Sequence, residues 1–196
     1  MLRMVAQDVG AAVSGLIELD WLKFVSFDLD KTLTGYVTPS VPEEAVGALT
    51  LLAGHGIKLA LVSNARGGRI ERVRRIGDEL SDKTGARVGT IVPSDATGQA
   101  KPHPAMFEAA AKAAGVEPGT CIHVGDQFCK DIIGAERAGF AGTVLVAPIG
   151  EGDHLGVRLL QRPVEFALRP ILGYPTRTKN FPDHLHHLSP QTPPHV

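Results

Sequence analysis

The chain has few cysteines, few aromatic residues and almost no net charge. Its 196 residues include only two cysteines, Cys121 and Cys129, aromatic residues make up 5%, and the formal net charge is −1 at pH 7. So few cysteines exclude a disulfide-rich secreted scaffold, and the spacing of the two matches no usual zinc site. The balanced charge argues against a basic nucleic-acid binder, so we expect no nucleic-acid partner.

Long uninterrupted hydrophobic runs are also missing. The mildly apolar N-terminal stretch is broken by charged residues such as Arg3, Asp8 and Glu18. No segment therefore fits a signal peptide or a membrane span. We expect a cytoplasmic protein, with any membrane contact peripheral and at the inner face of the membrane.

What the chain does have is the pattern of an α/β domain. Hydrophobic residues make up 43% of it, and apolar, β-branched runs alternate with helical patterns, as in repeated βα units with a mainly parallel sheet. Strands are predicted at 24–28, 57–63, 88–92, 121–124 and 143–146. Helices are predicted at 40–52, 70–76, 104–115 and 130–138, the first opened by a capping box of Ser40 and Glu43.

The domain organisation follows from the same pattern. Residues 1–21 are expected to form a helical lead-in, and residues 22–148 the core. A basic extension at 149–173 includes Arg158 and Arg162, and the tail at 174–196 is rich in Pro and His. We expect this tail to be poorly ordered and its histidines to be solvated.

Two carboxylates follow the first predicted strand of the core. Asp28 and Asp30 come where an apolar run ends, and Thr32 lies in the turn behind them. The carboxyl edge of an open α/β sheet is where ligands bind. There one carboxylate can attack an electrophile, while the other gives a proton to the leaving group and later takes one from water. Carboxylates so close repel each other, so we expect a cation beside them.

The later strands also lead into residues that suit phosphate chemistry. Ser63 and Asn64 follow the second strand, where a hydroxyl and backbone amides can hold phosphoryl oxygens; an ordinary helix cap is the alternative. Lys101 can neutralise a phosphate, unless it is a solvated loop lysine. Asp126 and Asp131 follow the fourth strand and suit a hard cation such as Mg²⁺. His123, inside that strand, is expected to be a core histidine.

Taken in order, these residues resemble the four motifs of the haloacid dehalogenase (HAD) superfamily of phosphohydrolases. The resemblance implies a Rossmann-like fold and Mg²⁺-dependent hydrolysis of a phosphomonoester through an aspartyl phosphate. It makes Asp28 the nucleophile and Asp30 the general acid/base, with Ser63 and Lys101 positioning the phosphoryl group. The Mg²⁺ ligands that it implies are Asp28, the backbone carbonyl of Asp30, Asp126 and Asp131. Lys31, Thr32 and Asn64 are then expected beside the substrate.

Proteins of this superfamily usually select substrates with an inserted cap domain. Here the segments 30–63 and 63–101 are filled by the predicted helices and strands, so no cap fits. An open site favours a large or surface-bound substrate, unless a second subunit covers it. An oligomer is therefore compatible with the sequence.

Two runs, from Val124 to Asp131 and from Gly139 to Pro148, resemble more closely the YqeG-type, phosphatidylglycerophosphate phosphatase-like branch of capless HAD proteins. That resemblance implies a phospholipid head group as substrate. The arginines after the second motif fit either an anionic membrane surface or a solvated helix face, and the amphipathic pattern favours the solvated face; they are Arg66, Arg69, Arg72, Arg74 and Arg75. Lys31 departs from the Asn usual in that branch. Two other functions stay open: a soluble phosphatase for a sugar phosphate, nucleotide or phosphoprotein, and a non-catalytic phosphate-binding or scaffold protein.

Overall fold

The structure is a computed structural model that describes residues 1–35, 40–96 and 98–149. Nearly all of the extension predicted at 149–173, and the whole tail predicted at 174–196, lie outside the described residues. Among the helices described here, none combines the length and the apolar character that crossing a membrane requires.

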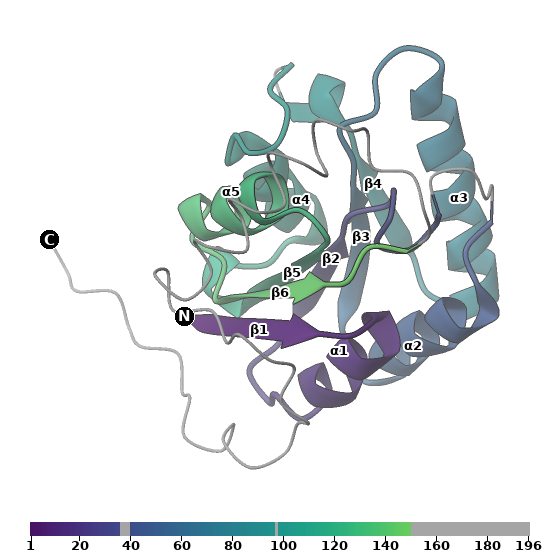
Figure 1. Ribbon diagram of the computed structural model, residues 1–196, viewed down its shortest axis with the longest axis vertical. Helices are drawn as coiled ribbons and strands as arrows, with labels where there is room; N and C mark the ends of the chain where they lie inside the picture. The colour runs from purple at the N-terminus through teal and green to yellow at the C-terminus, as the bar shows by residue number, and fades with distance from the viewer. Residues whose placement is uncertain (36–39, 97, 150–196) are drawn as a thin grey trace, which may run out of the picture.

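A six-stranded sheet forms the centre of the molecule (Figure 1). The strands lie side by side in the order β1-β6-β5-β2-β3-β4, and every neighbouring pair is parallel. Their bounds are β1 Leu2–Ala6, β2 Phe24–Phe27, β3 Lys58–Val62, β4 Val88–Ile91, β5 Cys121–Gly125 and β6 Gly142–Val146. The predicted α/β class with a mainly parallel, Rossmann-like sheet is confirmed.

Helices cover both faces of this sheet. The bounds are α1 Val9–Leu16, α2 Glu43–Gly54, α3 Arg69–Thr84, α4 Ala105–Ala114 and α5 Ile133–Arg137, with short turns η1 Pro93–Ala96, η2 Pro118–Thr120 and the π-helical η3 Phe128–Ile132. Side chains of α1, α2 and α3 join one hydrophobic cluster, and those of α4 and α5 join the cluster on the other face. The sheet is therefore the middle layer of three.

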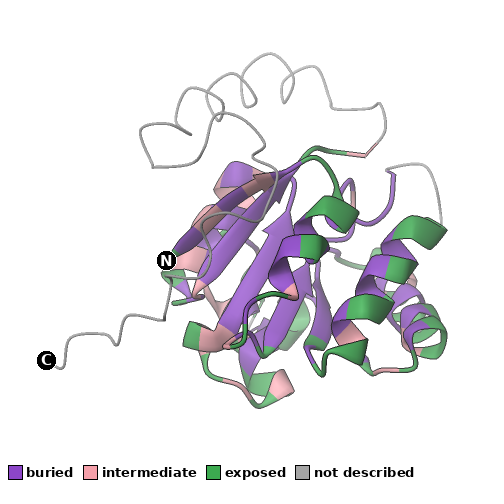
Figure 2. Cartoon of the chain, turned by 90° about the horizontal axis from the view of Figure 1, so that it is seen from below, coloured by how far each residue is buried: buried purple, intermediate pink, exposed green. Residues whose placement is uncertain are grey.

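The strands β2, β5 and β6 are buried on both faces, as expected inside a parallel sheet between two helical layers. Every residue of β2 and β5 is buried (Figure 2). On the α4 face, Phe107 packs edge-on against Phe140, with ring centroids 5.8 Å apart. Leu49 and Ile76 fill the opposite face. Only polar groups with a partner or a function are tolerated in such an interior.

The sheet topology places its binding edge between β2 and β5. All strands are parallel, so their carboxyl ends meet at one edge. The chain leaves β2 toward β3 on one side and leaves β5 toward β6 on the other, and such a reversal opens a crevice beyond the carboxyl ends. Asp28 continues the pairing at this point, because its backbone N–H donates a 2.9 Å hydrogen bond to the carbonyl of Val124.

The prediction of a helical lead-in at 1–21 was wrong in its first part. Leu2–Ala6 is the edge strand β1, which pairs along its whole length with β6, and only then does α1 follow. The five residues alternate between buried and half-buried positions. Their partner strand is about 140 positions away in the chain, so no local pattern reveals the pairing. The N-terminal segment belongs to the core of the domain.

Two helix predictions also need correction. The capping box does not form: α2 begins at Glu43 after the N-cap residue Pro42, and no side chain caps it, because Ser40 lies two positions too far upstream. The helix predicted at 130–138 is divided into the π-helical turn η3 and the short α5. Between Asp30 and Ser63 the described residues form α2 and β3, an arrangement compatible with the predicted absence of a cap.

Candidate active site

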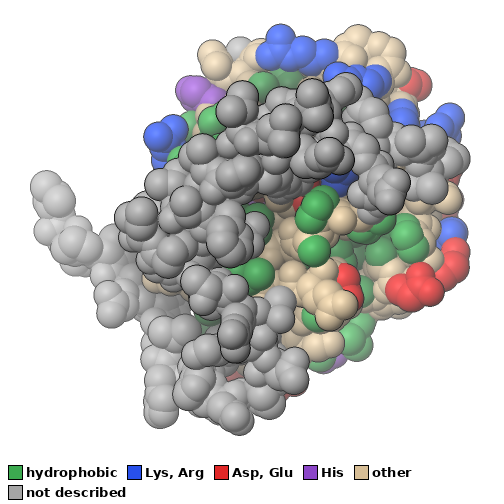
Figure 3. All heavy atoms as spheres, viewed as in Figure 1, with side chains coloured by type: hydrophobic (Ala, Val, Ile, Leu, Met, Phe, Trp, Pro, Cys, Tyr) green, Lys and Arg blue, Asp and Glu red, His purple; other side chains and the backbone are tan. Residues whose placement is uncertain are grey.

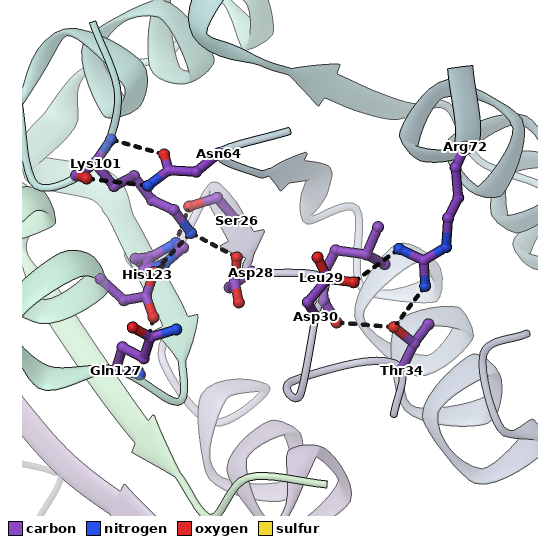
Figure 4. A network of polar contacts seen from close by, with 11 residues as sticks. Ser26, Asp28, Leu29, Asp30, Thr34, Asn64, Arg72, Lys101, His123 and Gln127 are labelled. Atoms are coloured by element: carbon purple, nitrogen blue, oxygen red, sulfur yellow. Dashed lines mark hydrogen bonds and ion pairs between the residues drawn. The ribbon is translucent and has the colours of Figure 1, made fainter. Parts of the chain in front are cut away.

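Three carboxylates and one lysine meet at the carboxyl ends of β2 and β5. Lys101 Nζ donates hydrogen bonds of 2.6 Å to Asp28 Oδ1 and 2.6 Å to Asp131 Oδ1 (Figure 4). Carboxylate oxygens of Asp28, Asp126 and Asp131 lie within 4.8 Å of one another, and all three residues are buried. The structure thus brings together four of the residues predicted from the sequence.

The carboxyl end of β5 is shaped by a glycine. A Cβ on Gly125 would lie 2.5 Å from the Asp131 side chain, closer than real Cβ contacts allow. Asp131 stands on η3 and is held from the other side by Gln127, whose backbone N–H donates a 2.9 Å hydrogen bond to Asp131 Oδ2. Only glycine at position 125 leaves room for this carboxylate beside Asp126.

The buried charges shift one another's ionisation. Burial raises the pKa of Asp28 to about 7, which Lys101 opposes and the charges of Asp131 and Asp126 reinforce. Burial on its own would lower the pKa of Lys101, but the two carboxylates that it contacts outweigh this effect, and the net shift is upward. Burial likewise opposes ionisation of Asp131, yet Lys101 and His123 hold its pKa well below the usual range. Lys101 is therefore an ammonium and Asp131 a carboxylate.

The donor set fits a divalent, oxygen-preferring cation. When ionised, the three carboxylates and the one ammonium carry a net charge of −2, and such a buried surplus is costly without a counter-ion. Carboxylate oxygens are the ligands that Mg²⁺ prefers. The Asp30 carboxylate is not part of this group, so contact of its backbone carbonyl with a cation stays a prediction.

Asp30 turns away from this group toward α3. Arg72 Nη1 donates a 2.7 Å hydrogen bond to Asp30 Oδ1, and Nη2 donates one of 3.2 Å to Thr34 Oγ1. Figure 4 shows the side chains of Asp28 and Asp30 pointing in different directions, toward Lys101 and Arg72 respectively. The sequence placed Arg72 on a basic helix face and gave no reason to connect it with Asp30.

Asn64 supports Lys101. Its side-chain amide donates a 3.0 Å hydrogen bond to the Lys101 carbonyl and accepts one of 2.8 Å from the Lys101 backbone N–H. The side chain expected beside the substrate thus fixes the backbone that carries the lysine, and its contact with substrate stays a prediction. Ser63 is buried at the end of β3, where its backbone N–H bonds to the carbonyl of Ile91 at 3.0 Å.

The turn behind Asp30 depends on an unusual backbone at Lys31. This residue has φ 71°, the left-handed region that non-glycine residues rarely adopt. Its N–H donates to the carbonyl of Thr34 at 2.6 Å, and its carbonyl accepts from Ile149 at 2.7 Å. Asn tolerates this conformation better than most residues, which gives a physical reason for the Asn usual here in the YqeG-type branch. Thr32, also in this turn, is fully buried.

A second polar pair lies behind the carboxylates. Ser26 Oγ is 2.8 Å from His123 Nδ1, and His123 Nε2 is 3.5 Å from Asp131 Oδ1. Burial lowers the pKa of His123 against the opposing effect of Asp131, so the ring is neutral. His123 is thus a partnered core residue; the signal for the missed Ser26 was a polar side chain within an apolar strand.

The fold is an α/β domain with a parallel sheet, and three buried carboxylates gather at the carboxyl edge of that sheet. The family model for haloacid dehalogenase-like hydrolases matches residues 33–139, which is more than half of the 196 residues. The chain belongs to the haloacid dehalogenase-like hydrolase family, and the resemblance drawn from the four motifs is confirmed.

Individual relatives agree with this assignment. The haloacid dehalogenase-like hydrolase domain-containing protein 3 of Bos taurus is 33% identical over 118 residues, 58% of this chain and 44% of the relative. The probable phosphatase YqeG of Bacillus subtilis (strain 168) is 26% identical over 132 residues, 67% of this chain and 68% of the relative. The chain therefore spans less than half the length of the bovine relative, whereas its likeness to YqeG covers two thirds of both chains and supports the YqeG-type branch.

Solved structures share the fold as well. An uncharacterized protein from Listeria monocytogenes serotype 4b matches with a TM-score of 0.52 at 19% identity, covering 64% of this chain and 91% of that chain. At this identity, the likeness concerns the fold alone.

Proposed function

We propose that this protein is a Mg²⁺-dependent phosphatase that hydrolyses phosphomonoesters through an aspartyl phosphate on Asp28. The observation that carries the proposal is the 2.6 Å contact of Lys101 with Asp28, next to the carboxylates of Asp126 and Asp131. A nucleophilic carboxylate, a fixed ammonium and a cation-binding group then share one buried site. Phosphoryl transfer depends mainly on such positioning and charge stabilisation.

The proposed reaction has two steps and needs only water as co-reactant. The Asp28 carboxylate attacks phosphorus, the bond to the leaving-group oxygen breaks, and Asp30 gives that oxygen a proton. Asp30 then takes a proton from water, whose oxygen attacks the phosphorus, and phosphate and the Asp28 carboxylate are released. Lys101 and Ser63 hold the phosphoryl oxygens in both steps. Bound Mg²⁺, held by Asp28, Asp126, Asp131 and the Asp30 carbonyl, would neutralise charge on the transferred group.

For the substrate, we infer a phosphatidylglycerophosphate-like lipid head group. The likeness to the YqeG-type branch supports this choice, as does the predicted absence of an inserted cap. Two exposed arginines, Arg66 in the loop before α3 and Arg69 at the start of α3, offer positive charge near the same edge. Lys and Arg side chains also line the upper rim of the face in Figure 3. Each such charge near an anionic membrane contributes about 1 kcal/mol.

A phosphate-release assay tests activity and substrate together. The panel contains phosphatidylglycerophosphate in vesicles, glycerol 3-phosphate, a nucleoside monophosphate and a phosphoserine peptide, each with Mg²⁺ and with EDTA. We expect Mg²⁺-dependent release that is fastest from the lipid. Faster release from a soluble ester would mean that the substrate is a soluble phosphomonoester and not the lipid. No release from any ester would favour a non-catalytic binding protein.

Membrane contact is tested separately by flotation. The protein is expected to float with vesicles that contain anionic lipid and to stay behind with zwitterionic vesicles, because the contact is electrostatic. Failure to float with anionic vesicles would contradict peripheral membrane contact.

A further inference from the structure

Arg72 occupies a position that the proposed reaction does not by itself require. Its guanidinium bridges Asp30, at 2.7 Å, and Thr34, at 3.2 Å. Thr34 is fully buried, and the neighbour of Arg72 on α3, Val73, is buried in the core. Arg72 and Thr34 therefore both lie on parts of the chain that pack into the core.

The Arg72–Asp30 pair is open to solvent, unlike the pair that Lys101 makes. The side chains of Arg72 and Asp30 are 25% and 34% exposed, against 2% for Lys101. Ion pairs this exposed contribute little to stability. An arriving molecule can reach the guanidinium, so ligand binding explains its place beside the acid/base residue better than stability does.

A second guanidinium extends the same helix face. Arg69 lies three residues before Arg72, and residues three apart share a face of a helix. It is the exposed first residue of α3, which follows the loop from Ser63. Among the described residues no ion pair of Arg69 is found.

We propose that Arg72, assisted by Arg69, binds a negatively charged group on the leaving-group part of the substrate. The inference rests on the proposed function and adds a substrate class: phosphomonoesters whose leaving group carries its own anion. Guanidinium groups bind carboxylates and phosphates through paired hydrogen bonds. The Asp30 carboxylate already occupies one such position on Arg72 and marks where a substrate anion fits.

Binding of that anion is coupled to the acid/base residue. A substrate oxygen that takes Nη1 of Arg72 removes the 2.7 Å partner of Asp30 and leaves its carboxyl group free to turn to the leaving-group oxygen. A neutral leaving group has no means of displacing Asp30. The site would therefore discriminate between substrates by the charge of the part that departs.

The test compares two soluble esters of the same three-carbon chain, propyl phosphate, whose leaving group ends in a methyl group, and propane-1,3-diyl bisphosphate, whose leaving group carries a second phosphate. We expect the wild-type protein to prefer the bisphosphate in kcat/KM, and Arg72→Ala to reduce this preference about tenfold, mainly through KM. Arg72→Lys should restore part of it. Arg75→Ala, which removes an exposed arginine of the same helix, should leave the ratio unchanged. An unaltered preference in folded Arg72→Ala would overturn the proposal.

A binding measurement separates this inference from the proposed function. In an Asp28→Asn background, calorimetry should detect tighter binding of the bisphosphate than of propyl phosphate, with the difference lost when Arg72→Ala is added. That result would sustain the anion site even if the wild-type protein released no phosphate. Equal binding of both esters would refute the anion site. Turnover by wild type and by Arg72→Ala is then compared on phosphatidylglycerophosphate vesicles. A larger loss in Arg72→Ala with the lipid than with the bisphosphate would identify a lipid phosphodiester, rather than a free anion, as the group that Arg72 binds.

Discussion

Lys101 Nζ lies 2.6 Å from Asp28 Oδ1, although the two residues are 73 positions apart in the chain. Both side chains are nearly inaccessible, 2% and 10% exposed. Breaking a buried ion pair by removing one partner leaves an uncompensated charge, at a cost of about 3–5 kcal/mol. The candidate catalytic centre is therefore also part of what holds β2 and the loop before α4 together.

Lys101→Met is expected to destabilise the metal-free protein by roughly 3–5 kcal/mol, because Asp28 and Asp131 lose their shared cation. Chemical denaturation in EDTA measures this loss. Lys112→Met, at an exposed position of α4, is the matched control and should change stability by less than about 0.5 kcal/mol. Equal stability of the two variants would mean that the buried pair is not formed.

Gly125→Ala is expected to damage the cation site, because the new Cβ would lie 2.5 Å from Asp131. A displacement of about 1 Å in such a site costs roughly 10²-fold in activity, and Mg²⁺ affinity should fall as well. Gly119→Ala, where a Cβ meets nothing within 4 Å, should behave like wild type. Mg²⁺ titrations followed by thermal shift compare the two, and unchanged affinity in Gly125→Ala would contradict the packing described.

Asn64→Ala should reduce activity while Lys101 itself remains. The substitution removes two hydrogen bonds to the Lys101 backbone, each contributing about 1 kcal/mol. We expect about tenfold slower phosphate release and a modest loss of thermal stability. Asn64→Asp keeps the acceptor that faces the Lys101 N–H and should lose less. If both variants kept full activity, Asn64 would not position the lysine.

Stability of the metal-free protein should depend on the Asp28 carboxyl group. Burial raises its pKa from 3.8 to about 7, so the folded chain binds this proton more tightly than the unfolded chain does. The stabilisation that comes from protonated Asp28 is complete below about pH 4 and is lost as the pH rises through about 7. Comparing thermal unfolding of wild type with Asp28→Asn across this range isolates the effect, since His123 and the other groups contribute to both. Parallel curves would contradict the shifted pKa.

The sequence predicted the parts of the site that sit at strand ends, because a strand end can be located from a local hydrophobic pattern. Asp28 and Asp126 converge as the parallel sheet requires, and Lys101 reaches Asp28 from the loop before α4. Contacts made across the fold had no such signal. Arg72 looked like one arginine among several on a solvated face, and its approach to Asp30 depends on how α3 packs. For the same reason β1 was missed, since its pairing with β6 joins the two ends of the described chain.

Local backbone chemistry explains the other discrepancies. Ser40 and Glu43 have the spacing of a capping box, but Pro42 takes the N-cap position and Glu43 instead bonds to Lys83 of α3 at 2.7 Å. Lys31 carried no signal for a left-handed residue, since that conformation is unusual for lysine. In both places the tertiary structure overrides the preference of the local sequence.

The measurement that tests the central claim most directly is phosphate release by wild type and Asp28→Asn from one phosphomonoester panel with Mg²⁺, at matched folded concentrations. Because the proposed reaction makes the Asp28 carboxylate the nucleophile, wild type should release phosphate and Asp28→Asn should be slower by roughly 10³-fold or more. Equal rates for the two proteins would contradict the account.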